Sequence, residues 1–292
     1  MKKLSQYIAP ILFSTTVATT TYAVDKSPLT LKVYNADGSS FHVNSTLVYG
    51  DTEAMVIDAG FTRADAFRIA ANVLDSGKTL TTIFISQADP DYYFGAETLK
   101  QFFPGVKIIT TPAVRKRIET KMKGKVAFWA PKMGGNAPIT PILPKAYNDT
   151  SLMVDGYKVE IKGTSGLLAH RPYIWIPSKK ALVGNIAIFG NLHVWTADTK
   201  TTEELDAWKA QLVEIKNLSP DIVVPGHMNS GTRLEVDSIN YTLSYLSKFG
   251  KALETSQNAS EVIKTMKQTY SEQKLSIALD IGAKVHKGEM KW

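Results

Sequence analysis

The chain has 292 residues, 44% of them hydrophobic, which is enough for a sizeable core in one large domain or two small ones. It contains no cysteine, so disulfide bonds and thiolate-based metal or nucleophile chemistry are excluded. The formal net charge is +7, but the lysines are scattered and form no basic stripe interleaved with aromatic residues, so we expect no nucleic-acid partner.

The first residues have the pattern of a secretory signal peptide. Two lysines precede an apolar run from Ile8 to Val17, and small residues lead to Ala23. The run is short for a bilayer span and contains hydroxyl side chains, so we expect cleavage near Ala23 rather than an uncleaved membrane anchor. The sequence thus predicts a signal peptide over residues 1–23, one domain over residues 24–292, and secretion to a bacterial periplasm, with no membrane contact after cleavage.

The first half of the predicted domain alternates strands and helices. Strands are expected at Leu29 to Val33, Asn44 to Tyr49, Ala54 to Ile57, Thr82 to Ile85 and Val106 to Thr110, and helices at Arg63 to Leu74, through Leu99 and Phe102, and at Ala113 to Met122. Residues 124–144 are rich in Pro and Gly and carry aromatic side chains. This composition indicates either a flap over a site or a surface insertion packed on its own aromatic residues.

The second half repeats the order of strands followed by helices. Strands are expected from Leu152, at Tyr157 to Ile161, Tyr173 to Ile176, Ala181 to Val183 and Asp221 to Val224, and helices at Glu203 to Asn217, Tyr241 to Leu253 and Val262 to Met266. Two such halves predict an α/β fold with helices outside two packed sheets, which is a four-layer sandwich.

Polar residues follow several of the predicted strands. They are Asp58, Asp89 with Asp91, His170, Asn185 and His227. Because strand ends meet at one edge of a sheet, we expect these side chains to share a site. The Asp89-Pro90-Asp91 segment also fits a simple turn in which Asp89 caps the following helix, and this alternative stays open.

These landmarks, taken in order, resemble the metallo-β-lactamase fold superfamily. The resemblance rests on the Asp58-Ala59-Gly60 turn, the segment from Ser86 to Gly95, the strand end at Val183-Gly184-Asn185 and the Pro225-Gly226-His227 turn, and it covers roughly Leu31 to Gly231. It implies a four-layer αββα sandwich. It also implies hydrolysis by water activated on metal ions, which in that superfamily are usually two and often zinc.

The residues at the implied ligand positions depart from the pattern of the superfamily. The usual His-x-His-x-Asp-His motif reads Gln87-x-Asp89-x-Asp91-Tyr92, and an asparagine, Asn185, stands where an acid usually bridges the two metals. A glutamine oxygen is a poor substitute for imidazole, and a tyrosine must lose a proton of pKa about 10 before it binds a metal strongly. We therefore expect no dinuclear zinc site.

A single divalent metal is compatible with the remaining donors. The resemblance assigns Asp89, Asp91, His170 and His227 as ligands of one zinc, iron or manganese ion, with Asp91 as ligand or general base. A water activated there would hydrolyse a small-molecule ester, lactone or lactam. Nucleophilic attack by a serine is disfavoured because the sequence has no Gly-x-Ser-x-Gly motif.

The alternative is a metal-free pseudoenzyme or small-molecule binding protein that uses the same cleft. Gln87, Asp89, Tyr92 and Asn185 would then line a hydrogen-bonding cleft, and one of the paired acids should have a raised pKa or a basic partner such as Arg171. Under either hypothesis, further candidate contacts to the ligand are Trp129, Trp195 and His193. The aromatic residues among them favour an apolar or ring-bearing ligand.

Overall fold

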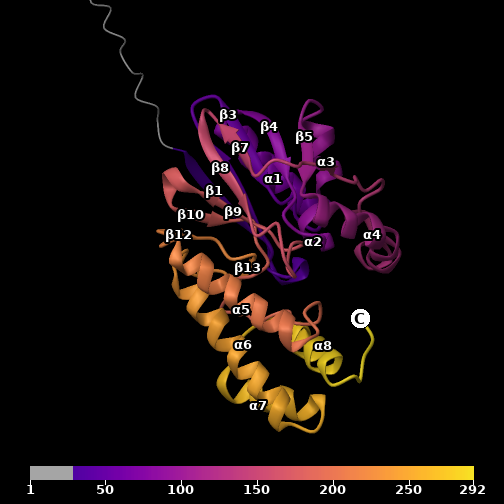
Figure 1. Cartoon of the computed structure of the whole chain (residues 1–292). Helices are drawn as coiled ribbons and strands as arrows, with labels where there is room; N and C mark the ends of the chain where they lie inside the picture. Colours follow the sequence, from indigo (N-terminus) through magenta and orange to yellow (C-terminus); the bar gives the residue numbers. More distant parts are fainter. Residues whose placement is uncertain (1–28) are drawn as a thin grey trace, which may run out of the picture.

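The computed structural model describes residues 29–292, so the predicted signal peptide lies outside the described residues. Two mixed sheets pack face to face, and helices cover the outer face of each (Figure 1). Within this part of the chain, no helix is long and apolar enough to cross a membrane.

The first sheet has six strands in chain order. They are β1 (Thr30–Asn35), β2 (Asn44–Tyr49), β3 (Glu53–Ile57), β4 (Thr79–Phe84), β5 (Lys107–Thr110) and β6 (Lys145–Ala146). The β1–β2–β3 pairs are antiparallel, whereas β3 to β6 run parallel. Parallel strands end at the same edge of the sheet, and at that edge the chain enters the short helix α2 (Pro90–Tyr93). The other helices of this half are α1 (Arg63–Ser76), α3 (Ala96–Phe102) and α4 (Pro112–Met133).

The second sheet has the strand order β12-β10-β9-β8-β7. Its strands are β7 (Ser151–Val154), β8 (Tyr157–Lys162), β9 (Tyr173–Ile176), β10 (Ala181–Val183) and β12 (Ile222–Val223). A separate two-stranded ladder pairs β11 (Phe189–Gly190) with β13 (His227–Met228) in parallel. Four helices follow or interrupt these strands: α5 (Thr202–Asn217), α6 (Asp237–Thr255), α7 (Ala259–Thr269) and α8 (Ser276–His286).

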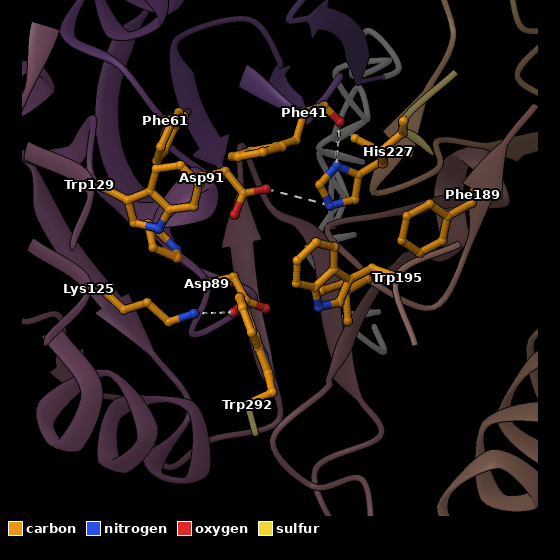
Figure 2. A pocket seen from close by; sticks show the side chains of 13 residues that line it. Phe41, Phe61, Asp89, Asp91, Lys125, Trp129, Phe189, Trp195, His227 and Trp292 are labelled. Carbon is orange, nitrogen blue, oxygen red and sulfur yellow. Dashed lines mark hydrogen bonds and ion pairs between the residues drawn. The ribbon is translucent and has the colours of Figure 1, made fainter. Parts of the chain in front are cut away.

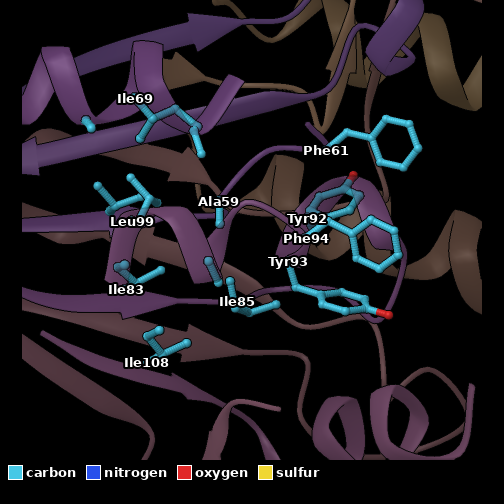
Figure 3. Close-up of a cluster of buried hydrophobic side chains, with 14 of the residues drawn as sticks. Ala59, Phe61, Ile69, Ile83, Ile85, Tyr92, Tyr93, Phe94, Leu99 and Ile108 are labelled. Atoms are coloured by element: carbon cyan, nitrogen blue, oxygen red, sulfur yellow. The ribbon is translucent and has the colours of Figure 1, made fainter. Parts of the chain in front are cut away.

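Three apolar layers hold the fold together. The first lies between the first sheet and its helices, where Ile83 and Ile85 of the β4 region face Ile69 and Leu99 (Figure 3). The second fills the space between the sheets, and the third packs the second sheet against α5 to α8. Burial of these side chains, at about 25 cal/mol per Å² of apolar surface, is the main stabilising force. The predicted four-layer αββα sandwich is confirmed.

Helix α4 is longer than the sequence predicts. It continues through Gly124 and Pro131 to Met133, where we expected a loop from residue 124 onward. Its apolar residues Val126, Trp129 and Met133 pack against the first core layer. This packing offsets the cost of a glycine within a helix, about 1 kcal/mol, and the loss of the backbone hydrogen bond that Pro131 cannot donate to the preceding turn. The aromatic residues of this segment are therefore presented on a helix, and a flap is not formed there.

Candidate functional site

The chain between β4 and α2 is anchored by Asp58. The Asp58 carboxylate accepts hydrogen bonds from the Ser86 backbone N–H at 2.7 Å and from the Ser86 hydroxyl at 2.8 Å. Burial raises the pKa of Asp58 to about 8, although both Ser86 bonds favour the charged form. At the far end of the segment, a Cβ at Gly95 would overlap the carbonyl oxygen of Ala59. The segment from Ser86 to Gly95, which contains α2, is thus held against the Asp58–Ala59 turn at both of its ends.

Asp91 and His227 face each other at the strand ends. The Asp91 carboxylate lies 3.5 Å from His227 Nε2, and both side chains are buried (Figure 2). The other ring nitrogen, Nδ1, lies 2.9 Å from the carbonyl oxygen of Phe41. A carbonyl oxygen only accepts hydrogen bonds, so Nδ1 carries a hydrogen. In the neutral imidazole, Nε2 therefore presents its lone pair to Asp91.

The protonation of this pair follows from burial. Burial raises the pKa of Asp91 to about 7 and lowers the pKa of His227 to about 4. Between about pH 4 and 7 a protonated Asp91 can donate to the neutral Nε2, and the pair then has no net charge. Above pH 7 the proton is lost and a buried carboxylate faces a neutral ring. One proton is thus exchanged near neutral pH at a fixed place in the fold.

An aromatic pocket opens above this pair. It encloses about 540 Å³, counted out to the solvent at its mouth. Trp129 makes edge contacts to Phe41 and Phe61, with ring centroids 5.3 and 5.4 Å apart, and forms one wall. On the opposite wall Trp195 lies 5.2 Å from Trp292 (Figure 2). The His227 ring stacks on Phe189 at 5.1 Å and closes the base.

A smaller cavity adjoins the aromatic pocket. The two share Asp89 and Ile186 in their linings. The remaining residues of the smaller cavity are mostly polar or charged: Gln87, Ala88, Arg117, Lys121, His170, Arg171 and Asp198. Lys125 lies 3.9 Å from the Asp89 carboxylate on the side of the aromatic pocket (Figure 2). Asp89 occupies the N-cap position of α2, but its side chain makes no capping hydrogen bond. Asp89 therefore stands where the helix-cap interpretation places it, but among the described residues its side chain does not cap the helix.

The four residues predicted to share one metal do not form a ligand group. Asp91 and His227 meet in the aromatic pocket, whereas His170 lines the smaller cavity. Among residues 29–292, no three His, Asp or Glu side chains are grouped closely enough to hold a metal ion. His170 also lies near Arg117 and Arg171, whose charges, together with burial as the larger cause, lower its pKa to about 3. Two guanidinium groups beside it oppose the entry of a further cation, so these residues do not fit the predicted metal.

The predicted hydrogen-bonding cleft is only partly formed. Gln87 lines the smaller cavity, and its amide donates to the Pro172 carbonyl at 3.1 Å. Asn185 is buried and uses its side chain internally: it donates to the Val224 carbonyl at 2.9 Å and accepts from the Ile188 N–H at 3.0 Å.

Tyr92 and His193 likewise make internal bonds. The buried Tyr92 hydroxyl donates to the Asn185 carbonyl at 3.3 Å. His193 lies 3.0 Å from the Tyr245 hydroxyl, within the helical layer of the second half. Together with Asn185 they are absent from the linings of both cavities. Their positions stabilise the walls and the core, so the expectation that they contact a ligand is not supported by the geometry.

Sequence reasoning missed several lining residues. Phe41, Phe61, Phe189 and Trp292 come from four distant segments, and no local pattern marks them as neighbours. Two cations of the smaller cavity, Arg117 and Lys121, were missed for a different reason. Arg117 and Lys121 are four residues apart on α4, so they share a helical face, but this spacing is equally typical of a solvated surface.

Comparison with known proteins agrees with the fold. A family model described as the metallo-beta-lactamase superfamily matches residues 39–227, which is more than half of the chain. A metallo-beta-lactamase family protein from Thermus thermophilus has a TM-score of 0.63 and 14% identity, over 89% of this chain and 91% of its own. A beta-lactamase domain protein from Burkholderia ambifaria has a TM-score of 0.60 and 13% identity, over 92% and 88%.

A metallo-beta-lactamase from Pontibacter korlensis is also similar, with a TM-score of 0.51 and 17% identity, over 76% of this chain and 95% of its own. At such identities the likeness to these three structures shows the fold alone. No curated protein sequence matches the chain.

Proposed function

Because the chain belongs to the metallo-beta-lactamase superfamily but does not gather the expected ligands, we propose that it is a divergent member that binds a small, ring-bearing molecule without a metal. The binding site is the aromatic pocket, at the strand ends where α/β folds place their ligands. The observation that carries the proposal is the Asp91–His227 pair, buried at the base of a pocket with aromatic walls.

The walls and the base select different parts of the ligand. Trp129 and Trp195 offer flat apolar faces on opposite sides, and each aromatic contact to a ligand ring contributes about 0.5–1.5 kcal/mol beyond its buried area. Asp91 and His227 offer one exchangeable proton and one lone pair, so they match a ligand group that both donates and accepts a hydrogen bond. A buried acid whose pKa is raised costs stability, and such groups cluster at functional sites.

Tryptophan fluorescence tests the proposal, because three of the five tryptophans line the pocket. Phenylacetamide, a neutral ring-bearing probe, should quench the emission saturably in chelator-treated protein. Trp129→Ala should weaken binding about tenfold or more, since about 1.4 kcal/mol corresponds to tenfold. Phe128→Ala is the matched control, because this neighbouring ring on α4 is 52% exposed and does not line the pocket. Equal affinities in the two variants would contradict the proposal.

A second candidate function is metal-independent hydrolysis of an ester, lactone or lactam in the same pocket. The titration of the Asp91–His227 pair near neutral pH favours it. Water would add to the carbonyl carbon while the pair takes its proton, and the pair would return that proton to the leaving oxygen or nitrogen. Product release from phenyl acetate by wild type, lost in Asp91→Asn, would support this function. Equal rates in the two proteins would exclude it.

A further inference from the structure

We propose that the smaller cavity is an anion subsite, which binds the carboxylate of a ligand whose ring lies in the aromatic pocket. This inference rests on the proposed function and names the class of ligand. It depends on two buried groups without matching partners, on the balance of charge around the cavity, and on the shared wall between the two spaces.

Arg171 is a buried cation that has no ion-pair partner in the part of the chain that the structure describes. Its side chain is 5% exposed and lines the smaller cavity. Its guanidinium donates to the Thr199 hydroxyl at 2.7 Å and lies over the Trp208 ring at 4.1 Å, but in residues 29–292 it has no carboxylate within 4.0 Å. A guanidinium has five N–H donors, and buried charges are normally paired because an unpaired one is costly. The cavity beside it is the place where an anion would supply the missing partner.

His170 provides the second unmatched group. Its Nε2 is buried in the wall of the smaller cavity without a hydrogen-bond partner in the described chain. Burial, with the charges of Arg117 and Arg171 added, keeps the ring neutral by lowering its pKa. In the tautomer with hydrogen on Nε2, this atom donates a hydrogen bond to an anion without adding charge.

The acids around the cavity are already engaged with other cations. Asp198 lies 3.5 Å from the Lys121 ammonium and accepts a hydrogen bond from Trp195 Nε1 at 2.9 Å. Asp89 faces Lys125 at 3.9 Å. Lining residues with a positive charge number three (Arg117, Lys121 and Arg171), against these two acids. Pairing Lys121 with Asp198 and Lys125 with Asp89 leaves two guanidinium groups, which attract an anion.

The two cavities together define an amphipathic ligand. Asp89 and Ile186 form a shared wall, so a ring in the aromatic pocket and a group in the smaller cavity lie within the reach of one small molecule. Counted in the same way, out to the solvent, the smaller cavity encloses about 360 Å³ against about 540 Å³ for the aromatic pocket, so it takes the smaller part of the ligand. A carboxylate suits this cavity, because its planar geometry matches the guanidinium fork. The ligand class is therefore an aryl-substituted small carboxylic acid.

Phenylacetate and phenylacetamide, which have nearly the same shape but differ in charge, test the subsite, and acetate serves as the anion without a ring. Dissociation constants for all three are measured by tryptophan fluorescence at constant ionic strength and pH 7. Phenylacetate should bind at least about tenfold more tightly than phenylacetamide, because a charge-assisted bond replaces a neutral one. Arg117→Gln should reduce this preference, because it removes one of the two guanidinium groups that line the cavity. Arg115→Gln is the matched control, since it removes the same charge from the same helix but its guanidinium pairs with Glu119, away from both cavities.

Each outcome separates the subsite from the aromatic pocket. Equal affinities for the acid and the amide in wild type would overturn the subsite while the aromatic pocket stands. Acetate binding as tightly as phenylacetate would show a site for a free anion and overturn the link to a ring. If the Arg117 and Arg115 variants lost the preference for phenylacetate equally, the preference would come from the overall charge of the protein, and the subsite would be overturned. If neither ring probe binds, the proposed function fails and the subsite fails with it.

Discussion

Replacing Asp91 by asparagine tests the acid–imidazole pair through stability. The folded state raises the pKa of Asp91 from 3.8 to about 7 by burial. Between these values the folded protein retains a proton that the unfolded chain has lost, so the free energy of unfolding falls as pH rises. At 1.36 kcal/mol per unit, the full penalty above pH 7 is about 4 kcal/mol. The asparagine side chain in Asp91→Asn would carry no charge at any pH, and its amide can donate to His227 Nε2.

The expected result is a stability difference that grows with pH. Asp91→Asn should unfold at nearly the same urea concentration as wild type at pH 4, and should be more stable by up to about 4 kcal/mol at pH 8. His227 acts in the opposite sense, because its lowered pKa makes stability rise between about pH 4 and 6.5. Burial is the largest cause of this lowered pKa and is common to both proteins, so comparing the variant with wild type at each pH removes that part of the His227 contribution.

Asp65→Asn is the matched control. Asp65 is also a buried aspartate, but its carboxylate accepts hydrogen bonds from Tyr34, Ser40 and Thr62. An amide nitrogen cannot accept them, so this variant should lose stability at pH 8 by about 1–3 kcal/mol. If Asp91→Asn were destabilised to the same extent, or if its difference from wild type did not change with pH, the raised pKa of Asp91 would be refuted.

Two further predictions address residues outside the pocket. His193→Ala should lower the free energy of unfolding by about 1–3 kcal/mol, because it removes the side-chain hydrogen-bond partner of the buried Tyr245 hydroxyl. It should leave the affinity for phenylacetamide unchanged, and an altered affinity would return His193 to the site. After expression in a secreting bacterium, mass spectrometry should give the mass of a chain that begins near residue 24, because the signal peptide is removed near Ala23. An intact N-terminus would contradict the predicted export.

The fold could be predicted from the sequence because hydrophobic periodicity indicates the strands and helices, and the order of the strand-end motifs indicates how they are arranged. Strand ends identified by apolar runs placed Asp91 and His227 at one edge, and the structure brings them to 3.5 Å. The end of a strand determines where the backbone goes, but it does not determine what a side chain binds. Asn185 follows β10 as expected, yet its amide is used to hold Val224 and Ile188.

Contacts between segments that are distant in the sequence could not be predicted from local sequence patterns. The sequence indicated Trp129 and Trp195 as aromatic residues near a cleft, but their neighbours Phe41 and Trp292 come from opposite ends of the described chain. Helix α4 was cut short in our prediction because Gly124 and Pro131 weaken a helix locally, whereas burial of its apolar face is a tertiary effect. The predicted part of the same helix carries Arg117 and Lys121 to the smaller cavity, so these cations were missed although their helix was expected.

The most direct test of the account is a binding titration on protein whose metal content is measured in the same sample. Chelator-treated protein, shown by elemental analysis to carry well under one metal per chain, is titrated with phenylacetate while tryptophan fluorescence is recorded. We predict saturable binding that is unchanged when zinc or manganese is added back. Binding that appears only after a metal is restored, at about one ion per chain, would contradict the metal-free pocket.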